Sequence, residues 1–326
     1  MIFFLPVMLS LAAGAAEAGT NVLSKPGLFR SMTEPPCSYC STQNRKGLIK
    51  DTDPVIAWIR GAHNGGAISI RHFLSAPRVI NDTYGLFFYD ADGDYVSVFP
   101  KDKGYEFFGW RNGVMLVQGP DGTLWSALSG RALEGPRNGD RLQRQPSFRT
   151  EWGHWMMLHP ESTAYNLFDG KKYPVVEIPS VMSVEALGTL GKPDARLQSD
   201  TPVLGVELGD QSRAYPLSAK LPLACFTDRL GSKAIAVFWY APTQSAVAFE
   251  SDLNKRSLTF HVDADAPPES APFKDSETGT RWSLAGRAVD GPLKGQELTW
   301  VNSVQCKWYA WAAEFPHTQI YVGQIK

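Results

Sequence analysis

Residues 125–136 read WSALSGRALEGP, and residues 282–292 read WSLAGRAVDGP. Downstream of each segment, six further identities lie 156 positions apart: Leu142 and Leu298, Ser147 and Ser303, Trp152 and Trp308, Trp155 and Trp311, Pro160 and Pro316, and Tyr165 and Tyr321. The offset at the first tryptophan is 157, so one residue is absent from the second segment. A repeat of this length predicts duplication of a whole domain rather than a solenoid unit.

The repeat divides the chain into five segments. We predict a signal peptide at 1–18, an arm with a CxxC motif at 19–50, a first repeat domain at 51–170, a linker at 171–199 and a second repeat domain at 200–326. Residues 2–16 are apolar and uncharged, and Ala16-Glu17-Ala18 is a sequence that signal peptidase accepts. We therefore expect a secreted or periplasmic protein with no integral membrane segment after cleavage.

The pattern of apolar residues predicts mainly antiparallel β structure. VIAWIRGA and AISIRHFL flank a Gly-rich turn, and LFFY and YVSVF flank Asp92-Gly93, a strong hairpin signal. Alternation along the second of these strands would place Ile68, Ile70 and His72 on one face. A helix after Thr150 carries Trp152 and Trp155 and ends at Pro160. With about one helix per copy, the expected fold is α+β in two tandem repeats.

The balance of 32 basic and 33 acidic residues excludes partners that need a strongly basic surface, so we expect no nucleic acid. The chain also lacks a GxSxG elbow, a phosphate-binding loop and an HExxH motif. These absences remove the commonest hydrolase, nucleotide-binding and metalloprotease interpretations. A small molecule, a glycan or an envelope protein remains as a partner.

Two pairs of cysteines are candidate disulfides in an exported chain. Cys37 and Cys40 could form a disulfide, stay inert, hold a metal or act as a redox pair. For Cys225 and Cys306 we predict a disulfide in preference to two buried thiols. Asp90, Asp92 and Asp94 resemble part of a calcium loop, but their setting favours a hairpin turn.

Candidate ligand-binding residues fall in two groups. Cys37, Cys40, His63, His72 and Arg71 could form a site of the first copy, which would admit a transition metal as cofactor. The plainer alternative is that His72 is a hydrogen-bonded core residue. Four tryptophans without clear counterparts are candidates for stacking on a ligand such as a sugar: Trp58, Trp110, Trp239 and Trp300.

The second repeat resembles the bacterial domain-of-unknown-function family 3179. The resemblance runs from Thr201 to Pro316 and rests on PVLGVELG, AYPL, AVAF, LTF and TGTRWS together with the repeated tryptophans. The first repeat, from Asp53 to Pro160, is a more divergent version. The resemblance implies a fold and export, and it implies no assigned reaction.

Members of that family are expected to carry a His-Glu pair and a Cys-Pro-Leu-Cys-Gly segment, which would suit a metal or redox centre. Here Pro77 and Arg78 stand at the first place in copy one, and Leu223 and Ala224 in copy two. Residues 91–94 and 241–244 stand at the second place. We therefore expect a binding or scaffold role that uses a cleft of the first copy or between copies, with an envelope enzyme or metal carrier as the alternative. Carbohydrate binding is the weaker alternative.

Overall fold

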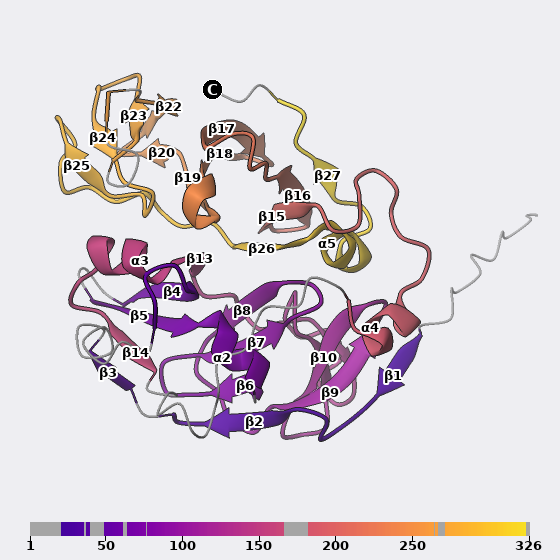
Figure 1. Cartoon of the computed structure of the whole chain (residues 1–326). Helices are drawn as coiled ribbons and strands as arrows, with labels where there is room; N and C mark the ends of the chain where they lie inside the picture. Colours follow the sequence, from indigo (N-terminus) through magenta and orange to yellow (C-terminus); the bar gives the residue numbers. More distant parts are fainter. Residues whose placement is uncertain are drawn as a thin grey trace, which may run out of the picture.

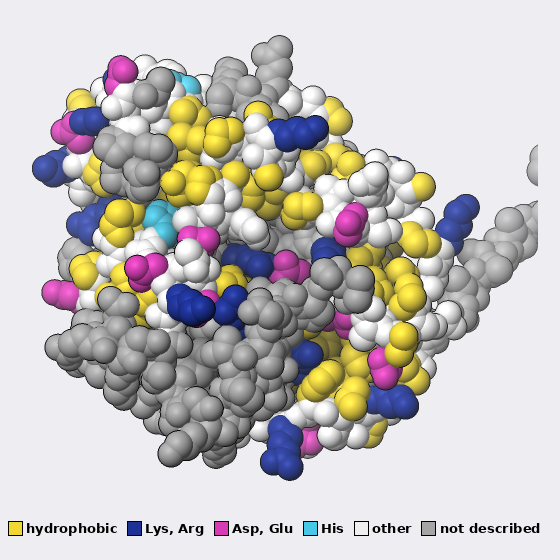
Figure 2. All heavy atoms as spheres, in the orientation of Figure 1, with side chains coloured by type: hydrophobic (Ala, Val, Ile, Leu, Met, Phe, Trp, Pro, Cys, Tyr) yellow, Lys and Arg dark blue, Asp and Glu magenta, His cyan; other side chains and the backbone are white. Residues whose placement is uncertain are grey.

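The computed structural model describes residues 21–35, 37–39, 49–60, 64–75, 77–165, 182–263, 265–266 and 271–323. The predicted signal peptide therefore lies outside the described residues, as does the first part of the predicted linker. Within the described part of the chain, no helix is long and apolar enough to cross a bilayer. Acidic and basic side chains are interspersed on the face drawn in Figure 2 rather than gathered by sign.

Three sheets make up the first half of the chain (Figure 1). One has the order β13 (Phe148–Glu151), β4 (Pro54–Arg60), β5 (Asn64–Ser69), β14 (Thr163–Tyr165) and β3 (Cys37–Tyr39). The second has the order β2 (Arg30–Thr33), β6 (Pro77–Asn81), β7 (Leu86–Asp90) and β8 (Tyr95–Phe99). The third has the order β1 (Val22–Ser24), β9 (Glu106–Arg111), β10 (Val114–Gln118), β11 (Leu124–Ser126) and β12 (Ala132–Glu134).

The second half has the same order of sheets without the strands from the N-terminal arm. One sheet has the order β26 (Ser303–Lys307), β15 (Pro202–Leu208), β16 (Gln211–Pro216) and β27 (Gln319–Ile320). The next has the order β17 (Leu223–Leu230), β18 (Lys233–Tyr240) and β19 (Ser245–Glu250). The last has the order β22 (Phe260–Val262), β23 (Phe273–Asp275), β24 (Arg281–Trp282) and β25 (Ala288–Asp290), and a small hairpin joins β20 (Asp252–Leu253) to β21 (Arg256–Ser257).

Short helices separate these strands: α2 (Ile70–Ser75), α3 (Trp152–Leu158), α4 (Val184–Thr189), α5 (Trp308–Glu314) and the 3₁₀ turn η1 (Ala241–Thr243). With antiparallel pairing between most strands, the α+β prediction is confirmed. One strand was predicted too long, because the backbone turns into α2 at Ile70. His72 therefore lies in a helix and does not share a strand face with Ile68.

Strand registers in the two halves match residue for residue. In the first half Val55 pairs with Thr150 and Ile56 with Arg149. In the second, Val203 pairs with Cys306 and Leu204 with Gln305, which lie 148 and 156 positions later. The hairpins β7–β8 and β18–β19 match in the same way at an offset of 150, and each turn ends in a left-handed residue, Asp94 or Gln244. Below, residues at matching positions are called counterparts.

Two clusters of the apolar core span both halves, and a third lies within the second half. One cluster joins first-half residues such as Trp155 and Phe87 to second-half residues such as Phe238 and Trp282. Another joins Trp125 of the first half to Trp308 of the second. Every residue of β7 and β8 is buried, because these strands are covered on both faces. This explains why LFFY and YVSVF lack the polar alternation of a half-exposed strand.

The two halves meet through reciprocal contacts. Strand β26 of the second half packs on β8, and β13 of the first half packs on β19 (Figure 1). The N–H of Lys307 donates to the carbonyl of Gly93, 2.8 Å away, in the β7–β8 turn. In the other direction the Thr243 hydroxyl lies 3.4 Å from Nδ1 of His154. Each turn thus reaches the helix of the opposite half.

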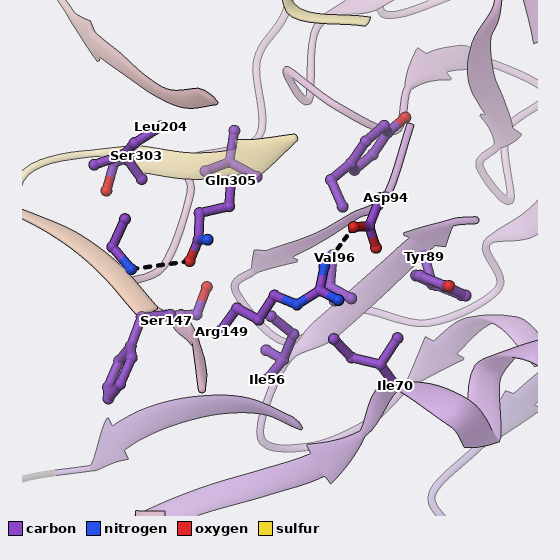
Figure 3. Close-up of a pocket in the computed structure, with 14 residues that line it drawn as sticks. Ile56, Ile70, Tyr89, Asp94, Val96, Ser147, Arg149, Leu204, Ser303 and Gln305 are labelled. Atoms are coloured by element: carbon purple, nitrogen blue, oxygen red, sulfur yellow. Dashed lines mark hydrogen bonds and ion pairs between the residues drawn. The ribbon is translucent and has the colours of Figure 1, made fainter. Parts of the chain in front are cut away.

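A cavity of about 20 Å³ lies at the centre of this boundary (Figure 3). Counterparts from both halves line it, including Ser147 and Ser303. Arg149 points at Asp94 and forms an ion pair at 2.6 Å, while the Gln305 side chain accepts a hydrogen bond from Ala246. The space has room for about one water molecule, so it is not the ligand cleft expected between the copies.

The predicted linker contains a segment that folds onto the first half. Helix α4 packs against β1 and β9, where the N–H of Gly113 donates to the Thr189 hydroxyl at 2.9 Å. Ser183 caps the helix by accepting a hydrogen bond from Ala186. This part of 171–199 therefore packs on the first half and helps to form a cavity there.

Candidate functional site

The candidate metal or redox residues are only partly within the described chain. Cys40 and His63 lie outside the described residues, and the structure describes the backbone but not the side chains of Cys37 and His72. Cys37 pairs with Tyr165 in the register of β3 and β14. Arg71 forms an ion pair with Asp53 at 3.0 Å. The proposed grouping of these residues stays a prediction, with Arg71 already bound to an internal carboxylate.

The predicted disulfide between Cys225 and Cys306 is not formed. Cys306 carries a free, buried thiol on β26, and burial raises its pKa above the ordinary value. Cys225 lies on β17 and packs in a different apolar cluster from Cys306. The prediction was wrong because the two strands belong to different sheets, and their side chains enter different parts of the core.

The four tryptophans chosen as stacking candidates are mainly core residues. Trp58 and Trp239 are 3% and 4% exposed, and the Trp239 indole donates to two backbone carbonyls. Trp300 packs between Phe148 and Phe249. Trp110 is also buried, but it lines an open cavity. Of these four, Trp110 is thus the one that the structure places beside space for a ligand.

That cavity, the Arg78 pocket, has a volume of about 480 Å³. It lies within the first half between β6, β7, β9, β10 and the start of α4, with residues 28–29 on one side. Its lining comprises Leu28, Phe29, Arg78, Tyr89, Asp90, Ala91, Asp92, Trp110, Met115, Met182, Ser183, Val184 and Glu185. The volume is within the range of small-molecule sites, and apolar side chains, aromatic and methionine among them, form most of the wall.

Arg78 is the unusual residue of the pocket. Its guanidinium lies over the rings of Phe29 and Tyr89, at 4.3 and 5.3 Å from their centroids. Burial lowers the pKa of Arg78, against the opposing effect of Tyr89, Asp90 and Asp92. Its Nη1 is buried and has no hydrogen-bond partner among the described residues. A buried donor of this kind costs free energy unless an acceptor reaches it.

Two carboxylates in the turn after β7 lie on the same cavity. Asp90 accepts hydrogen bonds from the N–H groups of Asp92 and Met115, at 3.0 and 3.2 Å. Burial nevertheless raises the pKa of Asp90 to about 7, and the neighbouring charge of Asp92 adds to the rise. Asp92 accepts from the N–H and the hydroxyl of Ser183, at 2.6 and 2.9 Å, which fixes α4 at the edge of the pocket.

The hairpin interpretation of Asp90, Asp92 and Asp94 is confirmed, with a four-residue turn between the paired residues Asp90 and Tyr95. Among the described residues there is no group of three or more His, Cys, Asp or Glu side chains arranged to hold a metal. Sequence reasoning missed the pocket because its walls come from five separated segments. The available signal was Arg78, a cation at the start of the buried stretch RVIN.

Residues 111–318 match the family model described as "Protein of unknown function (DUF3179)". The match covers more than half of the chain, and the chain therefore belongs to this family. It begins at the end of β9 and ends just before β27, so it includes most of the second half and the later part of the first. No curated protein and no solved structure matches the chain.

Proposed function

We propose that this chain is an exported, two-copy binding protein of the cell envelope, and that its Arg78 pocket takes a small uncharged molecule. Export rests on the apolar segment 2–16 and the Ala16-Glu17-Ala18 sequence. Duplication is supported by the equal sheet orders and by strand registers that agree at constant offsets. The binding role rests on one observation, the buried guanidinium of Arg78 with an unsatisfied nitrogen beside a cavity of about 480 Å³.

The surroundings of Arg78 favour a ligand with an acceptor oxygen. A carbonyl or hydroxyl oxygen in the cavity would satisfy Nη1, which has no acceptor in the described part of the chain. The negative charges of Asp90 and Asp92 already act on Arg78. A ligand carboxylate would add a further negative charge beside theirs, so a neutral acceptor fits better. Phe29 and Trp110 supply apolar surface for a flat body.

The copies differ at this place in a way that supports a single site. The counterpart of Arg78 is Ala224, which is fully buried, and the counterpart of Asp90 is Tyr240. Copy two therefore lacks both the cation and the carboxylate. By the resemblance to this family, Arg78 and residues 91–94 would stand at the places of the His-Glu pair and the cysteine segment. We infer that copy one kept a pocket there while its chemistry changed.

Benzamide is a suitable probe because it joins a neutral carbonyl to a flat ring. In protein labelled with ¹³C at the methionine methyls, benzamide should shift the Met115 and Met182 resonances, since both residues line the pocket. Benzoate should bind more weakly. Arg78→Met removes the donor but keeps an unbranched apolar chain, and it should abolish the shift while the protein stays folded.

The outcome for Arg78→Met distinguishes binding from a structural role. If benzamide shifts the methyls equally in the wild type and in Arg78→Met, Arg78 does not bind ligand and the proposal fails. A metal centre at Cys37, Cys40, His63 and His72 is the alternative proposal. Stoichiometric transition metal in protein purified from the periplasm, lost in His63→Ala and His72→Ala, would favour it.

A further inference from the structure

A second cavity lies at the boundary between the halves, and its lining residues come from other segments of the sequence than those of the Arg78 pocket. This Arg287 pocket has a volume of about 410 Å³ and lies between the end of α3 and the segment around β25. Its walls are largely apolar, and its polar groups are Ser283, Arg287, Lys294 and His159. Both cations are exposed at its rim.

The opposite boundary shows what an arginine at this position does when it has a partner. Arg131, the counterpart of Arg287, lies 3.3 Å from a carboxylate oxygen of Glu207. Arg141 binds the other oxygen, so two arginines hold one buried carboxylate from the opposite half. Nearby, the Ser129 hydroxyl donates to Glu314 on α5. This boundary is closed by carboxylates that the chain itself supplies.

The two boundaries have the same local geometry. Arg131 lies over the ring of Phe315, which follows α5 and packs on Trp311 with ring centroids 4.1 Å apart. At the other boundary His159 follows α3 and packs on Trp155 at 4.2 Å. Arg287 acts electrostatically on His159. The pair Arg287 and His159 therefore occupies the place of Arg131 and Phe315.

The carboxylates are missing at the Arg287 boundary. The counterpart of Glu207 is Ile59, and the counterpart of Glu314 is Leu158, which lines the pocket. Glu297 is paired with Arg287 through the backbone, but no ion pair links Arg287 to an acid within the described chain. The pocket beside Leu158 is open, and Lys294 brings a second positive charge to it.

From this comparison we propose that the Arg287 pocket binds an external carboxylate with a short apolar chain. The carboxylate would take the place that Glu207 and Glu314 fill at the opposite boundary, bound by Arg287 and Lys294. Met157, Leu158 and Val289 would contact the chain, and the exposed fractions of Met157 and Val289, 50% and 38%, leave surface for it to cover. The proposal concerns a site separate from the Arg78 pocket, although it uses the duplication proposed above.

Hexanoate is the probe, with hexanamide as its neutral match and inorganic phosphate as a different anion. In methionine-methyl-labelled protein, hexanoate should shift Met157 in a saturable manner and leave Met115 and Met182 unchanged. Hexanamide and phosphate should not shift Met157. Arg287→Gln should raise the Kd about tenfold or more, because a charge-assisted hydrogen bond is lost. Arg131→Gln, the matched control at the opposite boundary, should leave the Kd unchanged.

Leu158→Glu gives an independent test, since it places a carboxylate at the counterpart of Glu314. This variant should no longer bind hexanoate, because the new carboxylate would itself pair with Arg287 and Lys294. Equal shifts of Met157 by hexanoate and hexanamide would overturn the proposal, as would an unchanged Kd in Arg287→Gln. A response to phosphate alone would overturn the assignment to carboxylates. Because the reporters differ, failure here is separate from failure at the Arg78 pocket.

Discussion

The three repeated tryptophans of each half pack alike but differ in their hydrogen bonds. In the second half each indole N–H has an acceptor: Trp282 donates to Asp275 at 2.9 Å, Trp308 to the carbonyl of Asp194 at 3.1 Å, and Trp311 to Thr318 at 2.8 Å. In the first half the indole nitrogens of Trp125, Trp152 and Trp155 are buried with no hydrogen-bond partner among the described residues.

The difference has local causes. The counterpart of Asp275 is Gly119, which offers Trp125 no side-chain acceptor. The counterpart of Thr318 is Ser162, whose hydroxyl is itself buried without a partner. A fold can thus keep its aromatic packing while its buried polar groups lose partners, at a cost of about 1–3 kcal/mol for each group. The first half bears this cost, and it also contains the Arg78 pocket.

The largest expected effect is the loss of a repeated ring. Trp155→Ala and Trp311→Ala each remove a fully buried indole and leave a cavity, so each should lower the free energy of unfolding by about 3–5 kcal/mol. Urea denaturation followed by circular dichroism measures the change. A much smaller loss in one half would show that the two rings do not have equal packing roles.

A smaller loss of stability is expected when Glu207 is replaced by the residue that stands at its counterpart. Glu207→Ile introduces the residue found at position 59 and leaves Arg131 and Arg141 without their carboxylate. We expect the free energy of unfolding to fall by about 1–3 kcal/mol. The value should lie toward the lower end of this range because both arginines are partly exposed. Glu106→Ile, at an exposed strand position, is the control for the change in side chain. Equal effects of the two substitutions would contradict the role assigned to Glu207.

The hydrogen-bonding difference is tested directly by replacing tryptophan with phenylalanine. Trp311→Phe breaks the bond that the Thr318 hydroxyl accepts, whereas Trp155→Phe removes a donor that has no partner among the described residues. Trp311→Phe should therefore destabilise the protein by about 1 kcal/mol more than Trp155→Phe. The difference in free energy of unfolding follows from the urea midpoints, provided that the dependence on urea concentration is the same in both variants. A larger loss of stability in Trp155→Phe than in Trp311→Phe would contradict the prediction.

The smallest effect is a pair of opposing pH dependences. The pKa of Asp90 is raised to about 7, so its contribution to stability is present at low pH and is lost as pH rises from about 4 to 7. Burial, with Arg287 and His154, lowers the pKa of His159 to about 4. Stability from His159 is therefore present above pH 6.5 and is lost as pH falls toward 4.

Two substitutions separate these contributions. In Asp90→Asn only the contribution of His159 remains, so stability should rise with pH between 4 and 6.5. In His159→Phe, which introduces the residue found at the counterpart position 315, only the contribution of Asp90 remains, so stability should fall over the same range. Thermal unfolding measured at half-unit pH steps shows both slopes. A slope unchanged in Asp90→Asn would mean that Asp90 does not titrate in this range.

The hairpins and the α+β class were accessible from sequence because they depend on local signals. Glycine-containing turns between apolar runs mark the hairpins, and the 156-residue offset marks corresponding elements. The end of β5 was not accessible, since AISIRHFL suits a strand or a helix equally well by its apolar content. Tertiary packing decides for a helix at Ile70, which is buried in the shared core.

Sites assembled from distant segments could not be predicted with the same success. Arg78 and Trp110 are separated by three turns, and no spacing rule joins them to Ser183. Composition cannot tell a buried indole from one beside a cavity. It therefore could not separate Trp110, which lines the Arg78 pocket, from the three unpaired tryptophans that pack against other side chains. The pairing of Cys225 with Cys306 failed for a related reason, since neither sheet assignment nor the direction of a side chain can be read from a repeat alone.

The reciprocal contact of each turn with the opposite helix has an evolutionary meaning. Under the proposed duplication it is the arrangement of a two-fold homodimer, in which each surface meets its own copy. A single-repeat ancestor would have carried every substitution at both interfaces at once. Fusion into one polypeptide removed that constraint, so one boundary could keep an internal carboxylate at Glu207 while the other lost it at Ile59 and stayed open. Single-repeat relatives should accordingly be dimers with two identical boundaries.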